Sequence, residues 1–581
     1  MIKMIAYPED ILSQIYGYDQ FRGMQEQIIK AVIDGEDVLA LMPTGAGKSL
    51  CFQIPALCLD GIAIVVSPLI SLMQNQVMTL KQFGIKAEFI NSSLTEEEYF
   101  KIRREIKDTK VLYISPERFQ MEKFQNWLLE LDISFFAIDE AHCVSRWGHD
   151  FRPDYVKLDV IKNKFNKPII ALTATADLKT REDIPKVLKM KNTKIFIADF
   201  DRPNIKILVE EKINPKDQLM KIVNEFKDDS GIVYCLSRKK VEETTDFLKK
   251  QGVDAVSYHA GMNANDRKLN QDHFLLKEKV VAVATIAFGM GIDKPDVRYV
   301  VHMDMPQNLE AYYQEIGRAG RDGEPCVALL LYSLQDYALR NQMIYQNSSS
   351  QKMSELGKLN EMLAFSETLS CKRNYLMKYF GNENVSCNNC ESCLSQGESV
   401  KVTDLAQKVF DTVRATKMYY GMSYIALILK GSEAKNIKEE HKTLPTYNSV
   451  QEPDLVIKKT IRQMIVSGVL KIDLESGFNN LLIGKKLDFD IFIKKENAKI
   501  GLEKSLYDGD VDLVSKLKDL RTRLAAANGI PPYLVLHDKS IKEMSRKMPQ
   551  TLTNLKKIHG WGDKKIERYG QAFLEVLKNH K

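Results

Sequence analysis

A glycine-rich turn near the N-terminus has the residue types and spacing of a phosphate-binding loop. Residues 43–49 read Pro-Thr-Gly-Ala-Gly-Lys-Ser, after the apolar run 38–41 and before a helical pattern. In such a turn, backbone N–H groups at a helix N-terminus bind phosphate oxygens, Lys48 reaches the β- and γ-phosphates of ATP, and the Ser49 hydroxyl holds Mg²⁺. Met42 stands where the strict pattern has glycine, so a turn that only caps a helix is the alternative. The residues predicted to contact phosphate are Thr44, Gly45, Gly47, Lys48 and Ser49.

An acidic pair follows the apolar run 135–138. Asp139 and Glu140 open the sequence Asp-Glu-Ala-His. A carboxylate at the end of a buried strand can hold the Mg²⁺ of a nucleotide, and a neighbouring carboxylate can polarise the attacking water. An isolated pair of this kind usually begins a solvated helix, but a phosphate loop about 90 residues upstream favours a hydrolytic site. We therefore predict catalytic roles for Lys48, Asp139 and Glu140.

Two arginines three residues apart occur farther along the chain. Arg318 and Arg321 lie in the segment 314–321, and this spacing places them on one helix face. A guanidinium delivered across a cleft stabilises charge on a γ-phosphoryl group in transfer. An exposed basic face is the alternative, and we predict catalytic arginines if the two halves of the chain face each other.

Aromatic and basic side chains alternate directly after the acidic pair, between Cys143 and Tyr155. Aromatic faces together with guanidinium groups form a stacking surface for unpaired bases, although a buried aromatic cluster has the same composition. A nucleic-acid contact at this place would lie beside the ATP site. The residues predicted to bind are Arg146, Trp147, His149, Phe151 and Arg152.

Four of the nine cysteines fall within 23 residues. They are Cys371, Cys387, Cys390 and Cys393. Four thiolates complete a tetrahedral sphere, which indicates a structural metal rather than a catalytic one; zinc and an iron–sulfur cluster both fit the spacing. The remaining cysteines have apolar neighbours and are expected to be reduced, buried thiols; they are Cys51, Cys58, Cys143, Cys235 and Cys326.

Short apolar runs alternate with amphipathic stretches over the first 340 residues, and these elements must position the motifs. We expect strands at 62–67, 111–115, 135–139 and 168–173, then at 231–235, 280–285 and 297–303. We expect helices at 82–89 and 97–107. Two consecutive sets of this kind predict an α/β fold with two tandem domains, each around a parallel sheet.

The C-terminal part of the chain has a different pattern. A hairpin is predicted at 469–474 and 480–483, and several short helices at 511–581. The predicted division is 1–205 (first, ATP-binding domain), 206–343 (second domain), 344–400 (helical hairpin and metal module), 401–490 (winged helix), 491–510 (linker) and 511–581 (helical tail).

The composition excludes several classes of protein. Of the 581 residues, 44% are hydrophobic and 28% charged, and the formal net charge is only +6, unlike a histone-like or an acidic disordered protein. No apolar run approaches the roughly 20 residues of a membrane span; the run 62–66, for example, has five. The start of the chain carries no secretory pattern, so we expect a cytoplasmic protein. Residues 536–581 hold eleven Lys and Arg against five Asp and Glu, so the tail carries the whole net charge.

Taken in order, the motifs resemble those of superfamily 2 helicases, and in particular the RecQ family of DNA helicases. The resemblance rests on 21–25, 67–73, 115–118, 139–142, 173–176, 287–293 and 314–321, and it covers nearly the whole chain. It implies two RecA-like domains, and it adds Arg22, Gln25 and Asp293 to the ATP-binding residues, with Gln25 at the adenine edge. It also implies that the aromatic loop couples DNA binding to hydrolysis. We therefore predict that Trp147→Ala keeps Mg-ATP binding and weakens DNA stimulation of the ATPase; unchanged stimulation in a titration would refute this.

The same resemblance extends to the C-terminal modules. It favours zinc in the cysteine site, a winged helix whose turn residue Phe478 wedges a base pair, and a helical HRDC domain at the end. An exposed turn residue is the alternative for Phe478. Lys372 and Arg373 are expected either to touch the DNA backbone or to form a solvated face. In the HRDC-like tail, Trp561 replaces a smaller apolar residue, and the glycines beside it could contact phosphate or cap a helix.

The function implied is ATP-dependent unwinding of DNA, 3′ to 5′, in recombination, repair and fork processing. The implied cofactors are ATP, Mg²⁺ and Zn²⁺. The implied partners are single-stranded and forked duplex DNA, with a single-strand-binding protein and recombination or topoisomerase proteins, and no membrane; a bacterial protein would associate with the nucleoid. Two alternatives are a duplex translocase or RNA helicase, and a DNA-binding regulator that uses ATP as a switch.

Overall fold

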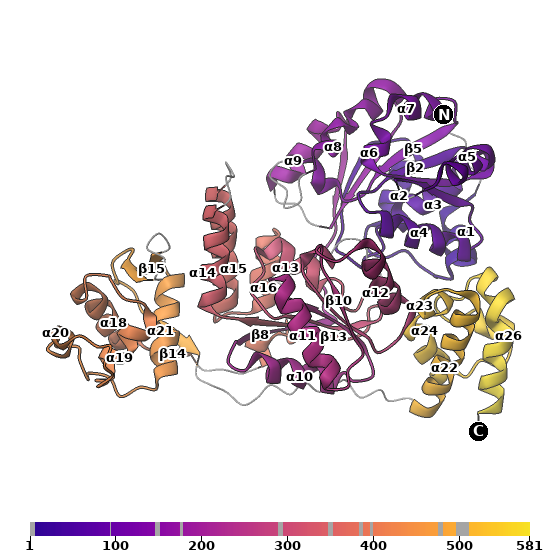
Figure 1. The fold of residues 1–581 in the computed structure, drawn as a ribbon. Helices are drawn as coiled ribbons and strands as arrows, with labels where there is room; N and C mark the ends of the chain where they lie inside the picture. Colours follow the sequence, from indigo (N-terminus) through magenta and orange to yellow (C-terminus); the bar gives the residue numbers. More distant parts are fainter. Residues whose placement is uncertain are drawn as a thin grey trace.

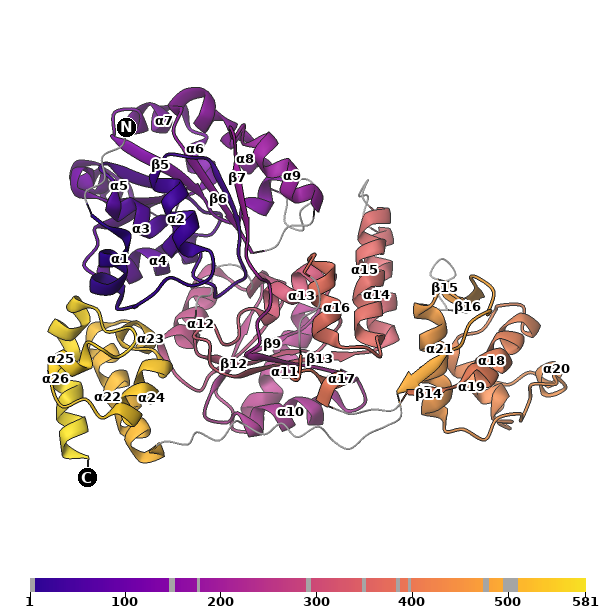
Figure 2. The same cartoon turned by 180° about the vertical axis from the view of Figure 1, so that it is seen from behind.

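The fold was analysed in a computed structural model of the chain (Figure 1). It describes residues 6–92, 94–145, 152–174, 178–288, 294–346, 352–382, 387–394, 399–473, 480–494 and 510–580. Two α/β domains lie side by side, with the winged-helix region beyond the second domain and the C-terminal helices against both (Figures 1 and 2).

The first α/β domain is built on a parallel sheet with the strand order β3-β4-β2-β5-β6-β1-β7 among the described residues. Alternate side chains of a strand enter different cores: Leu39 and Leu41 on one face, Val38 and Ala40 on the other. Both faces are therefore buried, as in parallel sheets covered by helices. The strands are β1 (Val38–Leu41), β2 (Ile62–Val66), β3 (Ala87–Ile90), β4 (Val111–Ile114), β5 (Ile133–Ile138), β6 (Ile169–Thr173) and β7 (Lys194–Ile197). The α-helices are α1 (Pro8–Ile11), α2 (Gln25–Ile33), α3 (Leu50–Cys58), α4 (Ile70–Gln82), α5 (Glu96–Glu105), α6 (Pro116–Phe119), α7 (Glu122–Leu128), α8 (Pro153–Val156) and α9 (Leu178–Val187).

The second α/β domain repeats the plan with the order β10-β11-β9-β12-β13-β8, again parallel throughout the described part. Its strands are β8 (Ile205–Glu211), β9 (Ser230–Tyr234), β10 (Ala255–Tyr258), β11 (Val281–Ala284), β12 (Val297–His302) and β13 (Cys326–Tyr332). Its helices are α10 (Pro215–Glu225), α11 (Arg238–Lys250), α12 (Ala264–Leu276) and α13 (Leu309–Ile316). Two tandem parallel-sheet domains are thus confirmed.

One predicted helix is wrong. Residues 82–89 end one element and begin another: α4 ends at Gln82, a turn follows at Gly84 with φ +78°, and β3 starts at Ala87. Because β3 is the edge strand of the sheet and its middle residues Glu88 and Phe89 are only half-buried, its sequence has the mixed polarity of a helix. The strands predicted from the sequence are all present, and their ends are shifted by one or two residues.

A helical pair and the cysteine segment follow the second sheet. The helices are α14 (Leu334–Gln346), α15 (Lys352–Glu367), α16 (Lys372–Tyr379) and α17 (Glu391–Leu394). The cysteine segment packs on the sheet, because the Ile207 amide donates to Asn389 O at 3.2 Å and Ile207 forms a bridge with Cys390. The metal module therefore borders the edge strand β8.

The winged-helix region has its own core and is attached to the second domain by α21. Its elements are β14 (Ser399–Lys401), α18 (Thr403–Ala415), α19 (Met422–Leu429), α20 (Glu439–Lys442), α21 (Asp454–Val466), β15 (Leu470–Asp473), β16 (Asn480–Ile483) and β17 (Phe492–Lys494). The predicted hairpin is confirmed as the antiparallel pair β15–β16. Arg462 of α21 forms a bidentate pair with Glu211 at 2.8 and 3.0 Å and a second pair with Glu367 at 2.9 Å.

The tail is a separate bundle with its own core. Its helices are α22 (Val511–Asn528), α23 (Pro532–Val535), α24 (Asp538–Lys547), α25 (Leu552–Leu555) and α26 (Asp563–Asn579). The expectation of short helices is wrong for α22 and α26, which have 18 and 17 residues. Trp561 is 1% exposed and packs edge-on against Phe573, so it fills the core of this bundle.

Within the part of the chain that the structure describes, none of the helices combines the length and the apolar character that crossing a bilayer requires. The five scattered cysteines are all buried, and burial raises the pKa of Cys51, Cys58, Cys235 and Cys326 to about 12, as expected for inert thiols.

Candidate functional site

The phosphate loop lies where sequence reasoning put it, between the end of β1 and the start of α3. Gly45 and Gly47 have φ of +82° and +78°, a backbone region that side chains rarely adopt, so glycine is needed at both turns. Lys48 Nζ donates to Met42 O at 3.3 Å, which folds the ammonium group back over the loop. Ser49 is the N-cap of α3 and its hydroxyl makes no capping hydrogen bond. The segment therefore forms the glycine-rich strand-to-helix turn that the sequence predicts.

Gln25, at the start of α2, contacts the phosphate loop directly. Its side chain is buried, and its Nε2 donates to Ala46 O at 3.0 Å and to Gly47 O at 3.2 Å. Its Oε1 accepts from the Arg22 amide at 2.9 Å. In the structure both the nitrogen and the oxygen of the Gln25 amide are therefore hydrogen-bonded within the chain. To bind an adenine edge, Gln25 must give up these bonds and form new ones to the base.

The acidic pair lies at the end of β5, in the middle of the sheet. Burial, with repulsion from Glu140, raises the pKa of Asp139 to about 7, although Lys48 opposes the shift. Glu140 has φ +49°, a strained left-handed conformation for a non-glycine residue, and its buried Oε2 accepts no hydrogen bond. A carboxyl desolvated by burial, with a second carboxylate next to it and a lysine nearby, fits a divalent cation.

The acidic pair is also linked to its neighbours by hydrogen bonds. His142 Nδ1 and Thr173 Oγ1 are 2.9 Å apart, which ties the end of β5 to the end of β6. Tyr155 Oη donates to Asp139 O at 3.0 Å, and Arg152 donates through its backbone to Cys143 O at 3.0 Å and through Nη1 to Pro68 O at 3.2 Å. The described residues that flank 146–151 are thus joined to each other, and Tyr155 is bonded to Asp139 O.

Several predicted site residues lie outside the described residues. These are Arg146, Trp147, His149, Phe151, Asp293 and Phe478.

The two catalytic arginine candidates come from the second domain and reach the same cavity. A cavity of about 320 Å³ is lined by Lys48, Asp139 and Glu140 from the first domain and by Arg318 and Arg321 from the second. Both arginines lie in the turn that follows α13, so the expectation that they share a helix face is wrong, although both reach the cavity. The structure thus brings together the phosphate loop, the acidic pair and both arginines, which the sequence places up to about 270 residues apart.

The tail also lines this cavity, which sequence reasoning missed. His559 accepts from Arg22 Nη2 at 3.1 Å and its ring lies 4.8 Å from that of Tyr18. Burial, with Lys539 and Arg22 nearby, lowers the pKa of His559 to about 4, so the ring is neutral and can accept. Lys565 also borders the cavity, and burial lowers its pKa to about 8.

The glycines beside Trp561 contact the first domain. The Gly560 amide donates to Gly17 O at 2.8 Å, and the approach leaves no room for side chains: a Cβ at Gly17 would lie 2.6 Å from Gly562 N, and a Cβ at Gly562 would lie 2.2 Å from Ile15 O. Gly562 is the N-cap of α26, which confirms the helix-cap alternative, and both glycines also form a contact with the first domain.

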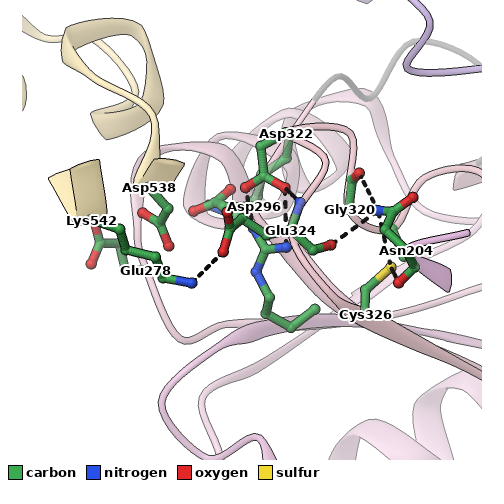
Figure 3. A network of polar contacts seen from close by, with 12 residues as sticks. Asn204, Glu278, Asp296, Gly320, Asp322, Glu324, Cys326, Asp538 and Lys542 are labelled. Atoms are coloured by element: carbon green, nitrogen blue, oxygen red, sulfur yellow. Dashed lines mark hydrogen bonds and ion pairs between the residues drawn. The ribbon is translucent and has the colours of Figure 1, made fainter. Parts of the chain in front are cut away.

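Ion pairs fasten the tail to the second domain as well (Figure 3). Arg521 is 1% exposed and pairs with Glu278 at 2.5 Å and with Asp538 at 2.7 Å. Lys542 pairs with Glu324. The tail thus contacts both domains beside the cavity. Part of its positive charge is paired with carboxylates of the second domain.

The four clustered cysteines form a candidate metal site. One ligand atom from each lies within 4.8 Å of the others, and the Cys371 and Cys390 Sγ atoms are 3.7 Å apart without a disulfide. Four converging thiols fit a tetrahedral ion, and with no position left open the metal's role is structural.

Both expectations for the basic pair after Cys371 are wrong. Lys372 and Arg373 are 3% and 2% exposed, so they face neither solvent nor DNA. Lys372 Nζ donates to the backbone carbonyls of Phe365, Ser366 and Thr368. Both side chains donate to backbone carbonyls of the protein itself, which leave no signal in the sequence.

The fold and the site define an ATP-hydrolysing motor with two RecA-like domains. The chain matches the family models for DEAD/DEAH box helicase (22–184), helicase conserved C-terminal domain (214–323), RecQ zinc-binding (334–394), RQC domain (396–502) and HRDC domain (510–577). It is 40% identical to the ATP-dependent DNA helicase RecQ of Haemophilus influenzae, over 100% of this chain and 97% of that one. It is 35% identical to the RecQ of Bacillus subtilis, over 99% of both chains.

The chain belongs to the RecQ family of ATP-dependent DNA helicases. Its helicase activity depends on ATP and Mg²⁺, and the RecQ zinc-binding match assigns zinc rather than an iron–sulfur cluster to the four cysteines. The RQC and HRDC matches identify the winged-helix region and the tail.

Proposed function

We propose that ATP hydrolysis in the cavity between the two motor domains drives 3′-to-5′ movement along single-stranded DNA and thereby separates duplexes. The observation that carries this proposal is the cavity itself, because it is lined by the phosphate loop and acidic pair of one domain and by Arg318 and Arg321 of the other. A nucleotide bound there would contact both domains, so its hydrolysis would change how they fit together. The polarity rests on family membership alone.

Each residue of the site has a proposed role. Lys48 binds the β- and γ-phosphates, Glu140 polarises the attacking water, and Arg318 and Arg321 stabilise charge on the γ-phosphoryl group. Bound Mg²⁺ would supply charge neutralisation at the phosphates. The residues proposed to hold the metal are Ser49, Asp139 and Asp293, and those proposed to hold the rest of the nucleotide are Arg22, Gln25, Thr44, Gly45 and Gly47.

DNA is proposed to contact the loop after Ser145, through Arg146, Trp147, His149 and Phe151, with Arg152 at its end. The anchors described above support this, because Tyr155 and Arg152 fix the end of the loop to Asp139 O and Pro68 O. A base stacked on the loop could then shift the acidic pair. Phe478 is proposed as a wedge at the tip of the β15–β16 hairpin.

The cellular role proposed is DNA recombination, repair and fork processing on single-stranded and forked DNA. Association with a single-strand-binding protein, with recombination or topoisomerase proteins, and with a nucleoid belongs to this proposal. So do the domain limits 1–205, 206–343, 344–400, 401–490, 491–510 and 511–581.

The direct test is strand separation on fluorescent duplexes with a 3′ tail, a 5′ tail or blunt ends. We expect ATP-dependent separation of the 3′-tailed duplex, and none with the 5′ tail or with Lys48→Ala on any substrate. Separation of the 5′-tailed duplex instead would overturn the polarity.

Two further substrates separate the alternatives. A 3′-tailed RNA duplex of the same sequence tests an RNA helicase, and a triplex displaced from blunt DNA tests a duplex translocase. A DNA-binding regulator that uses ATP only as a switch predicts no DNA-stimulated turnover with any of them.

A further inference from the structure

The connection between the two motor domains passes along the edge of the ATP cavity. It leaves β7 at Ile197 and enters β8 at Ile205. Arg202 lies in its middle, is only partly accessible, and has its pKa lowered by burial. No role was predicted for it from the sequence.

The Arg202 guanidinium joins the phosphate loop to the arginine-bearing segment. On one side it donates to the backbone carbonyl of Thr44. On the other it donates to Ala319 O at 3.1 Å and Gly320 O at 2.8 Å, with Gly317 O at 3.5 Å. A planar fork with several fixed donors is suited to holding carbonyls from two segments at once, and a lysine is not.

The two segments that Arg202 joins are also in close contact with each other. A Cβ at Gly317 would lie 2.0 Å from Thr44 Oγ1, and a Cβ at Gly45 would lie 3.0 Å from Arg202 Nη1 and 3.4 Å from Arg321 Cα. The distance between the phosphate loop and the catalytic arginine candidates is therefore set at this contact, where small displacements move Arg318 and Arg321 relative to bound phosphate.

The zinc module holds the connection from the other side. Arg373 of α16 donates to Asp201 Oδ1 at 2.6 Å, to Arg202 O at 2.7 Å and to Ile205 O at 2.5 Å. Phe200 stacks on Phe380 at 5.4 Å, directly after the same helix. The backbone that carries Arg202 is thus fixed by α16.

The arginine-bearing segment is held farther along as well (Figure 3). Asn204 Nδ2 donates to Gly320 O at 2.9 Å and to Glu324 O at 3.0 Å. Arg298 of β12 pairs with Asp322. These bonds fix the segment to the second domain. Arg202 joins it to the phosphate loop.

We propose that Arg202 is a positioning residue for ATP hydrolysis, which sets Arg318 and Arg321 against the phosphate loop, and that Arg373 of the zinc module holds it in place. The inference rests on the proposed roles of Arg318 and Arg321. Arg202 itself touches backbone carbonyls, so its contribution is the placement of the catalytic groups rather than contact with the reacting atoms.

The test compares Arg202→Gln and Arg202→Lys in the full chain. For Arg202→Gln we expect kcat of the DNA-stimulated ATPase to fall about 10- to 100-fold, as for other misplacements of about 1 Å. Binding of a fluorescent ADP analogue should change by less than about threefold, because ground-state binding uses the intact loop. Arg202→Lys keeps the charge without the fork, so its kcat should lie between those of Arg202→Gln and the unaltered protein.

Arg373→Lys tests the support from the zinc module. It should lower kcat in the same direction with an unchanged zinc content, measured by release of the metal to a colorimetric chelator. The matched control is Arg104→Gln, an exposed arginine on α5, which should leave kcat, ADP binding and the melting temperature unaltered.

Two results would overturn the proposal. One is a wild-type kcat in folded Arg202→Gln, or in Arg202→Lys if the glutamine variant does not fold. The other is a loss confined to KM and ADP affinity, which would make Arg202 a nucleotide-binding residue. Absence of DNA-stimulated turnover in the unaltered chain would instead refute the proposed function.

Discussion

At the scale of single residues, the acidic pair combines strain, burial and charge. Glu140 is held in a left-handed backbone conformation with a buried oxygen that accepts no hydrogen bond, beside a carboxyl whose pKa is raised. A strained backbone and a desolvated carboxyl both destabilise the fold, and they persist only where the rest of the structure holds them in place. Strain and shifted pKa values of this kind are typical of catalytic positions.

The role of Glu140 is tested by Glu140→Gln. The amide keeps the size of the side chain and cannot polarise water, so we expect kcat of the ATPase to fall by about 10²- to 10⁴-fold with little change in nucleotide affinity. The measurements are steady-state ATPase and binding of a fluorescent ADP analogue. Glu130→Gln changes an exposed residue of the same type ten positions upstream and should retain full turnover; equal losses in both variants would contradict the role.

The raised pKa of Asp139 predicts a pH-dependent stability. Its folded pKa of about 7 lies above the unfolded value near 4, so the ionised form opposes folding, and stability falls as pH rises from about 4 to 7. Asp139→Asn removes this cost, so at pH 8 its melting temperature should be higher by roughly 2–4 °C per kcal/mol recovered. The gain should shrink towards pH 4, and turnover should be lost throughout. A lower melting temperature at pH 8 would contradict the prediction.

At the scale of elements, the sheets were predictable because parallel strands buried on both faces are continuous apolar runs. β3 was mistaken for a helix because an edge strand lacks that signature. The phosphate loop, acidic pair and cysteines were found because their chemistry depends on local spacing. Arg202 was missed, and Arg373 was wrongly assigned to DNA or solvent, because their partners in other elements lie more than 100 residues away and are mostly backbone carbonyls, which carry no sequence signal.

The contact of the cysteine segment with β8 predicts a local effect of zinc removal. Without the metal, the segment that presents Asn389 O should loosen, and the Ile207 amide that donates to it should exchange with solvent faster. Hydrogen–deuterium exchange before and after chelation measures this, with the amide of Ile232 in the central strand β9 as the internal reference. Equal acceleration at both amides would indicate global unfolding instead.

At the scale of the whole molecule, the tail is both a basic module and a bridge between the motor domains. Its ion pairs with the second domain involve Glu278 and Glu324, while its contacts with the first are made largely by the glycine loop and His559. Salt screens such charge pairs, and it screens those that are partly exposed more than those that are buried.

We therefore expect the tail of the double variant Glu278→Gln, Glu324→Gln to detach at lower salt than that of the unaltered protein. Removing Glu278 takes one carboxylate from Arg521, and removing Glu324 takes one from Lys542. A larger radius of gyration in solution scattering at 150 mM salt, with unchanged secondary structure, would report detachment. Glu567→Gln removes a carboxylate that pairs within the tail, with Lys564, and should leave the scattering profile unaltered.

The close approach of Gly17 and Gly562 has a consequence for reading other chains with the same modules. The tail packs against the first domain only because two positions, 545 residues apart in the sequence, both lack a side chain. Gly562 has an ordinary φ of −77°, so a methyl group there meets only the neighbouring domain and not its own backbone. A chain with any larger residue at either position cannot pack its tail against the first domain in this way. Whether this distant module packs here can therefore be predicted from two residues of the sequence.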